Sequence, residues 1–366
     1  MHFGLFYPYL LLIIQDRLKD NTLIFKLIKS KELLGWKNHV LAFSMKIFNK
    51  SFWILLIVVM TIGASCSQEV PKTTISNGTM ECEIYLPDVK NGYYRGTRFD
   101  WAGVIPNLEY KNHTYFGKWF KKYEPTIHDA IMGPVEAFGP IGYDSAKPGE
   151  EFVKVGVGIL QRPDLSTYHF SKSYEILDHG VWHVETKKDE VGFTHKLAEG
   201  EFPYTYRKVI KLKDNKLIIK HKLVNNGNNT INTYVFNHNF FVIDEQNVGP
   251  GFTVKFPFTI EGDTTSLGNF AEVVNGNEIK FIKELGEKDH PMIVKLSGFG
   301  SSNKDYNIIV ENINRKAGVR ITADKPLSNV VFWSAMKTLS PEPYIDINLG
   351  SKDSFSWTIT YEFYTF

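Results

Sequence analysis

The chain has 366 residues, a formal net charge of +2, 22% charged residues and 43% apolar residues. That apolar share supports a large buried core and excludes a disordered chain, and two cysteines are too few for a disulfide-stapled mini-protein. The even mixture of apolar and polar residues also excludes a multi-pass membrane protein. In residues 1–66 the basic residues outnumber the acidic ones, so the rest of the chain is slightly acidic and leaves no basic domain to bind nucleic acid.

The first element in chain order is an export signal. Lys46 and Lys50 form a positively charged region before the apolar run 52–62. This run is too short to span a bilayer comfortably. We therefore predict a lipoprotein-type signal peptide at residues 45–65. Residues 1–44 show no comparable organisation, and we interpret them as an upstream extension from a mis-assigned start, with an unusual leader as the alternative.

Small residues lie directly before Cys66, in the sequence Gly63-Ala64-Ser65. This arrangement resembles the lipobox of bacterial lipoproteins, and the serine that follows is similar to lipoproteins of the Bacteroidetes type. The resemblance implies cleavage before Cys66, acylation of its thiol, and anchoring to the bacterial cell envelope at the outer membrane or facing the periplasm. Residues 66–79 would then be the lipidated cysteine and a tether. An ordinary signal peptide or a single membrane anchor is the alternative.

From residue 80 to the end, the dominant hydrophobic period is two. Apolar residues alternate with polar or small ones over 153–159, 252–260 and 355–363, which predicts strands with one face in a core. Turn-forming residues such as the asparagine-rich run 225–229 separate these strands, and no sustained helical period is present. The pattern predicts an all-β fold, a large antiparallel sandwich or barrel, with 80–366 as a single domain.

The first cluster with candidate chemistry lies at 93–101, where Tyr94, Arg95, Arg98 and Trp101 are close in sequence. Guanidinium groups bind planar carboxylates through paired hydrogen bonds, and aromatic faces suit sugar rings. The cluster is therefore a candidate substrate-binding site for a carboxylate or a sugar. A surface strand with Arg–Asp pairing explains the same residues equally well.

Two further motifs can supply acid–base chemistry. In a strand, Asn237 and Asn239 would share one face and His238 would take the other. Asparagine is unusual in strands, so these residues suggest a cleft, although a lone histidine is more often structural. Prolines on both sides of Glu342 fix the backbone around one carboxylate, which suits a general base, although a turn before the last strand accounts for them as well.

Other polar residues give weaker signals. His128 and Tyr143 lie in a loop-like stretch from 123 to 150 and are candidate substrate-binding residues at a rim. The remaining histidines lack metal-ligand spacing, so we predict no metal site. If Cys66 carries lipid, Cys82 has no partner and is expected to be a buried thiol.

Together these motifs resemble the galactose mutarotase-like superfamily, of the aldose 1-epimerase type, over most of residues 80–366. The resemblance implies a β-supersandwich, with His238 as general acid in an Asn-His-x-Phe-Phe motif and Glu342 as general base. It also implies sugar binding by an arginine, for which Arg95 or Arg98 is the match, and His128 as the counterpart of a second histidine. The Asn-Arg dipeptide of ordinary members is missing, and ordinary members are commonly cytosolic.

The predicted export and the arginine cluster favour a function on oligosaccharides that carry acidic sugars. The chain resembles exported Bacteroidetes oligosaccharide dehydratases that act in ulvan breakdown, which implies β-elimination at a uronic acid. A base removes the C5 proton, an arginine neutralises the carboxylate, and an acid protonates the group leaving C4, so that a dehydratase or a lyase yields a 4,5-unsaturated uronate. Arg95 and Arg98 favour this reaction, because a neutral hexose does not need two cations.

Two alternatives stay open. The first is mutarotation of free sugars by the same acid and base, and the second is a non-catalytic lipoprotein that binds glycans at the cell surface. In each case the partner is a sugar or oligosaccharide, and the protein is expected to be a monomer that needs no cofactor.

Overall fold

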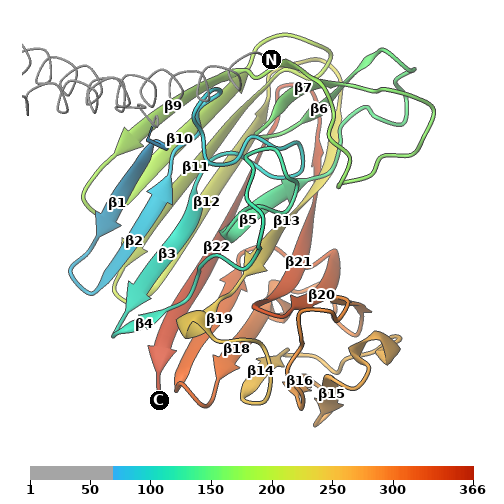
Figure 1. Cartoon of the computed structure of the whole chain (residues 1–366). Coiled ribbons are helices and arrows are strands. Elements are labelled where there is room, and N and C mark those ends of the chain that lie inside the picture. The colour runs from blue at the N-terminus through green and yellow to red at the C-terminus, as the bar shows by residue number, and fades with distance from the viewer. Residues whose placement is uncertain (1–68) are drawn as a thin grey trace, which may run out of the picture. The chain divides into compact units, whose positions relative to one another are not determined.

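The computed structural model of the protein describes residues 69–366 (Figure 1). The predicted extension 1–44, the signal peptide 45–65 and the lipidated Cys66 lie outside the described residues. Within 69–366 the chain forms 22 strands and three short 3-10 helices, which are Ile243–Glu245 (η1), Thr265–Leu267 (η2) and Asn303–Asp305 (η3). No helix in this part of the chain is long and apolar enough to cross a membrane.

The largest sheet has ten strands, and all its neighbouring strands are antiparallel. In spatial order they are Ala271–Val274 (β15), Glu278–Phe281 (β16), Phe252–Lys255 (β14), Asn307–Asn312 (β18), Ala317–Ala323 (β19), Ser354–Thr365 (β22), Lys216–Asn225 (β12), Tyr204–Lys213 (β11), Glu190–Leu197 (β10) and Val181–Thr186 (β9).

A second, five-stranded sheet carries the residues that matter most for function. Its strands, in spatial order, are Met292–Leu296 (β17), Asn329–Ala335 (β20), Thr338–Leu349 (β21), Ile231–Phe240 (β13) and Gly133–Phe138 (β5). Every neighbouring pair in it is antiparallel.

Two smaller antiparallel sheets complete the fold. The four-stranded sheet consists of Lys72–Ser76 (β1), Met80–Tyr85 (β2), Val104–Tyr110 (β3) and His113–Thr114 (β4). The three-stranded sheet consists of Glu151–Lys154 (β6), Gly158–Gln161 (β7) and Ile176–Asp178 (β8). The predicted all-β, antiparallel fold class is confirmed.

Alternating side chains build the main core between the sheets. In β22, Trp357, Ile359, Tyr361 and Phe363 are buried, while the residues between them are partly exposed, as the period of two predicts. These side chains share one apolar cluster with residues of the five-stranded sheet and with Ile75 of the four-stranded sheet. The core therefore holds the two large sheets together and fixes the backbone on which the polar residues stand.

Three segments differ from the sequence-based expectation. The predicted strand 153–159 is a hairpin: β6 ends at Lys154, and the turn before β7 contains Gly156 with a φ of 78°, a conformation that glycine adopts readily. In the predicted strand 252–260 only Phe252–Lys255 is extended, because Pro257 has no N–H for a ladder. Residues Lys72–Ser76, within the expected tether, pair with β2 and bury Ile75.

Candidate functional site

The register of two neighbouring strands brings His238 and Glu342 together. The pairing of β13 with β21 continues to Phe236 and resumes in the same register at Phe241, so His238 stands directly opposite Glu342. Side chains at directly opposite positions of antiparallel strands lie close together. The Nε2 atom of His238 is 3.0 Å from Oε1 of Glu342, and both side chains are buried.

The prolines beside Glu342 interrupt the hydrogen-bond ladder at this place. Leu339 donates its N–H toward β13, and residues two apart on a strand face the same neighbour, so Pro341 and Pro343 lack the donors that would face β13. Side chains replace part of the ladder: the Asn239 N–H donates to Ser340 Oγ at 2.8 Å, and Asn239 Nδ2 donates to the Pro341 carbonyl at 2.7 Å. The proline motif is therefore part of a strand and not a turn.

Burial sets the protonation of the pair. Burial raises the pKa of Glu342 to about 8, against the opposing charge of Arg98 and with a smaller contribution from Asp129. Burial, followed by the charge of Arg98, lowers the pKa of His238 well below its usual range. Both shifts favour the uncharged forms, so that the pair carries one titratable proton, as a neutral carboxyl group beside a neutral imidazole. Such a pair can both give and take a proton.

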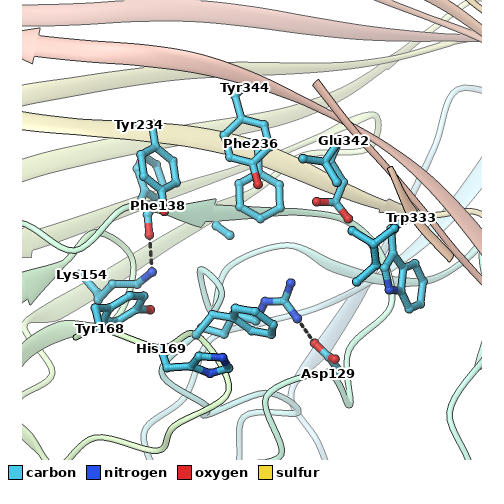
Figure 2. A pocket seen from close by; sticks show the side chains of 15 residues that line it. Asp129, Phe138, Lys154, Tyr168, His169, Tyr234, Phe236, Trp333, Glu342 and Tyr344 are labelled. Carbon is cyan, nitrogen blue, oxygen red and sulfur yellow. Dashed lines mark hydrogen bonds and ion pairs between the residues drawn. The ribbon is translucent and has the colours of Figure 1, made fainter. Parts of the chain in front are cut away.

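A cavity of about 410 Å³ opens beside Glu342 (Figure 2). Aromatic side chains form much of its wall, and the rings of Tyr344 and Phe236 stack at 4.3 Å. His238 lies behind this wall, where its ring stacks on Phe240 at 3.7 Å. Glu342 therefore lines the cavity and can contact a bound molecule, whereas His238 is its partner behind the wall.

Arg98 is one of the two cationic side chains that line the cavity. Its guanidinium group lies between the rings of Phe99, at 4.6 Å, and Phe170, at 4.1 Å, and forms an ion pair with Asp129. The His128 Nε2 atom lies 3.1 Å from the other carboxylate oxygen of Asp129. Arg98 is thus held rigidly at the cavity, with its charge already compensated by a carboxylate.

Lys154 is the second cation, and the sequence analysis did not identify it. It ends β6, where Phe152, Val153 and Lys154 are all buried, so the strand has no exposed face there. A period-two reading places this lysine in solvent. The signal that could have identified it is a lysine between two valines, because burying a charge there is costly unless a partner or a ligand compensates it.

Comparison with known proteins identifies the architecture. No protein-family model matches the chain, and no curated protein matches it. A solved structure from Synechocystis is 12% identical with a TM-score of 0.51, and the match covers 82% of this chain and 97% of that one. A candidate aldose 1-epimerase from Escherichia coli is 13% identical with a TM-score of 0.51, and the match covers 81% of this chain and all of that one. This is the galactose mutarotase-like fold. At these identities the likeness concerns the fold alone.

Within the mutarotase-like fold, four residues predicted to bind substrate form hydrogen bonds outside the cavity wall. Tyr94 OH donates to the His128 carbonyl at 3.0 Å, and Trp101 Nε1 donates to the Gly96 carbonyl at 2.8 Å. The other two also donate to backbone carbonyls: Tyr143 OH to Ser166 at 3.1 Å and Arg95 Nη1 to Val89 at 3.4 Å. These bonds shape the loops around the cavity. Of the two arginines in the cluster, Arg98 lines the cavity and Arg95 does not.

The two asparagines beside His238 face the other side of β13, toward the core of the mutarotase-like fold. Asn237 Nδ2 donates to Glu136 Oε1 at 3.0 Å, and Asn239 Oδ1 accepts from Tyr361 OH at 2.7 Å. Neither side chain lines the cavity. Their roles in this structure are to satisfy buried polar groups and to position the strand that carries His238.

Replacing Asn239 by alanine is expected to destabilise the protein by about 1–3 kcal/mol, because the Tyr361 hydroxyl and the Pro341 carbonyl then lose their partner in a buried place. Urea unfolding measures the loss. Asn348, which is exposed on β21, provides the control, and its alanine variant should stay within about 0.5 kcal/mol of wild type. An unchanged stability with lost sugar binding would instead place Asn239 in the binding site.

Proposed function

We propose that the protein is a carbohydrate-active enzyme that moves a proton on a sugar bound in the cavity, with Glu342 as the group that contacts the sugar. The observation that supports this proposal is the one-proton pair of Glu342 and His238 at the wall of an aromatic cavity. Aromatic rings offer large flat faces to a sugar ring, and a neutral carboxyl group with a neutral imidazole partner supplies both an acid and a base.

The first candidate reaction is aldose 1-epimerisation, the activity named for the Escherichia coli structure. In this reaction the anomeric hydroxyl loses a proton and the ring oxygen gains one, after which the ring opens, rotates and closes as the other anomer. Glu342 and His238 hold one proton and one free base position between them, which matches this exchange.

The second candidate reaction is β-elimination at a uronic acid, and the cations of the cavity favour it. Arg98 and Lys154 both line the wall, and Arg98, whose charge acts on Glu342, would stabilise the enolate-like intermediate formed after the C5 proton is removed. Arg95 bonds to a loop carbonyl, so in this proposal Lys154 takes the place of the second cation expected from the sequence. The predicted lipid anchor on Cys66 would place either enzyme at the cell envelope, where oligosaccharides arrive from outside.

The test incubates the purified protein with fresh α-glucose, with glucuronate and with uronate-containing oligosaccharides. Faster decay of optical rotation is expected for epimerisation, and new ultraviolet absorbance from a conjugated double bond is expected for elimination. Mass spectrometry then separates loss of water from chain cleavage. If no sugar gives either signal but the protein still binds glycans after His238 is changed to alanine, the enzyme proposal is wrong and a binding protein is indicated.

A further inference from the structure

The end of the cavity away from Glu342 is formed around Lys154. Figure 2 shows Lys154 and Tyr168 at one end of the cavity and Glu342 and Trp333 at the other. The Lys154 side chain is only 2% exposed, so its ammonium group is taken out of bulk water and meets the cavity instead. The cavity therefore has a proton-transfer end and a cationic end.

The ammonium group of Lys154 has more donors than partners. Nζ donates to the Phe138 carbonyl and lies 5.4 Å from the centre of the Tyr168 ring, but within residues 69–366 it has no carboxylate partner. An ammonium group carries three N–H donors, so two of them remain for a ligand. Burial, followed by the charge of Arg98, lowers the pKa of Lys154 to about 7, and a bound anion would reverse this effect.

The other cation of the cavity does not share this property. Arg98 already forms an ion pair with Asp129 and is enclosed by two aromatic rings. Other groups at the wall that carry or can carry charge are Glu342, His169 and three tyrosines, and none of them is bonded to Lys154. Of the two basic side chains of the cavity, Lys154 is therefore the one without a carboxylate partner within the described residues.

We propose that Lys154 forms an anion-binding subsite, so that the sugar recognised by this protein carries an acidic group, a carboxylate or a phosphate ester, at the end remote from Glu342. The proposal rests on the proposed function in one respect, which is that a sugar occupies the cavity. It fits an epimerase of acidic sugars directly, whereas in an eliminase the carboxylate bonded to C5 lies beside Glu342, so Lys154 would bind a second acidic group of the substrate. A lysine that only packs against the Phe138 carbonyl is the competing explanation.

Binding is measured without turnover, by the fluorescence change of the protein, since Trp333 lines the cavity. The ligands are glucuronate, its uncharged methyl ester, glucose and glucose 6-phosphate. A charge-assisted hydrogen bond predicts that glucuronate or glucose 6-phosphate binds about ten- to a hundredfold more tightly than its uncharged counterpart, and the tighter acid identifies the group. Equal affinity of acids and neutral forms, or no binding of either acid, overturns the proposal.

A variant assigns the effect to one side chain. Lys154→Met keeps an unbranched side chain that is one atom shorter and removes its charge, so the preference for the acid should disappear while binding of the neutral ester is unchanged. Lys337→Met, at an exposed turn, is the matched control and should keep the preference. A preference that survives in Lys154→Met points to Arg98 and overturns the proposal. If this variant does not fold, Lys154→Gln, which also removes the charge but keeps a donor for the Phe138 carbonyl, is tested in the same way, and a preference that survives in it overturns the proposal.

These results are distinguishable from failure of the proposed function. Tight binding of an acidic sugar without any turnover contradicts the catalytic proposal and supports the subsite. If the protein turns over sugars but binds neutral and acidic sugars with equal affinity, catalysis is supported and the subsite is contradicted.

Discussion

Replacing Glu342 by glutamine is expected to reduce turnover of the sugar substrate by about a hundred- to ten-thousandfold, the usual contribution of a positioned acid or base. Glutamine keeps the size of the side chain and its place opposite His238, but it cannot release or accept a proton in this reaction. The initial rate is measured by optical rotation or ultraviolet absorbance, according to the reaction found. Full activity in this variant would remove Glu342 from the mechanism.

The same substitution should increase stability at alkaline pH, which separates lost chemistry from lost folding. The folded-state pKa of Glu342 is about 8 and its ordinary value is 4.5. Because the folded protein keeps a proton that the unfolded chain releases, stability is lost as pH rises from about 4.5 to about 8. Glutamine does not titrate, so the variant's Tm should exceed that of wild type at pH 9 and approach it at pH 5. A variant that is less stable at pH 9 would contradict the burial argument.

Replacing Lys208 by methionine is expected to destabilise the protein by about 3–5 kcal/mol, because it breaks a buried ionic cluster and leaves its carboxylates without a counter-ion. The Lys208 side chain is fully buried, pairs with Glu136, and has its Nζ atom 3.5 Å from Asp100 Oδ2. Burial raises the pKa of Asp100 to about 7, against the charge of Lys208. Chemical denaturation gives the free energy of unfolding.

Two further proteins complete this experiment. Lys220→Met, at an exposed position of β12, should change the free energy of unfolding by less than about 0.5 kcal/mol. Adding Glu136→Gln and Asp100→Asn to Lys208→Met removes the uncompensated charge and should recover part of the loss. A loss below about 1 kcal/mol in the single variant would mean that water reaches the cluster.

The fold class was predictable because its dominant signal is local. Trp357, Ile359, Tyr361 and Phe363 follow a period of two through a single long strand, and burial in the structure follows the same period. The hairpin at 153–159 shows the limit of this reasoning. Alternation looks the same whether one strand continues or a glycine turn folds two short strands together, and the choice depends on partners distant in sequence.

The site was predictable in part for the same reason. His238 and Glu342 were selected because their short motifs resemble those of mutarotase-like proteins, and the register of β13 and β21 brings the two side chains together. Lys154 and Arg98 meet at one cavity through tertiary packing, and no spacing in the sequence encodes that meeting. Spacing also could not separate Arg98 from Arg95, which is three residues away but bonds to a loop carbonyl.

The two prolines that flank Glu342 have a consequence for observing the site in solution. They remove the exchangeable backbone protons that β21 would present to β13, so the nearest backbone reporter is the amide of Asn239, which donates to the Ser340 hydroxyl. Exchange of that proton with deuterated solvent follows separation of the strands at the His238–Glu342 pair. The exchange rate of the Asn239 amide can be compared with the rates of the fully bonded amides farther along β13. A faster rate at Asn239 alone indicates local opening of the site, and equal rates indicate unfolding of the whole sheet.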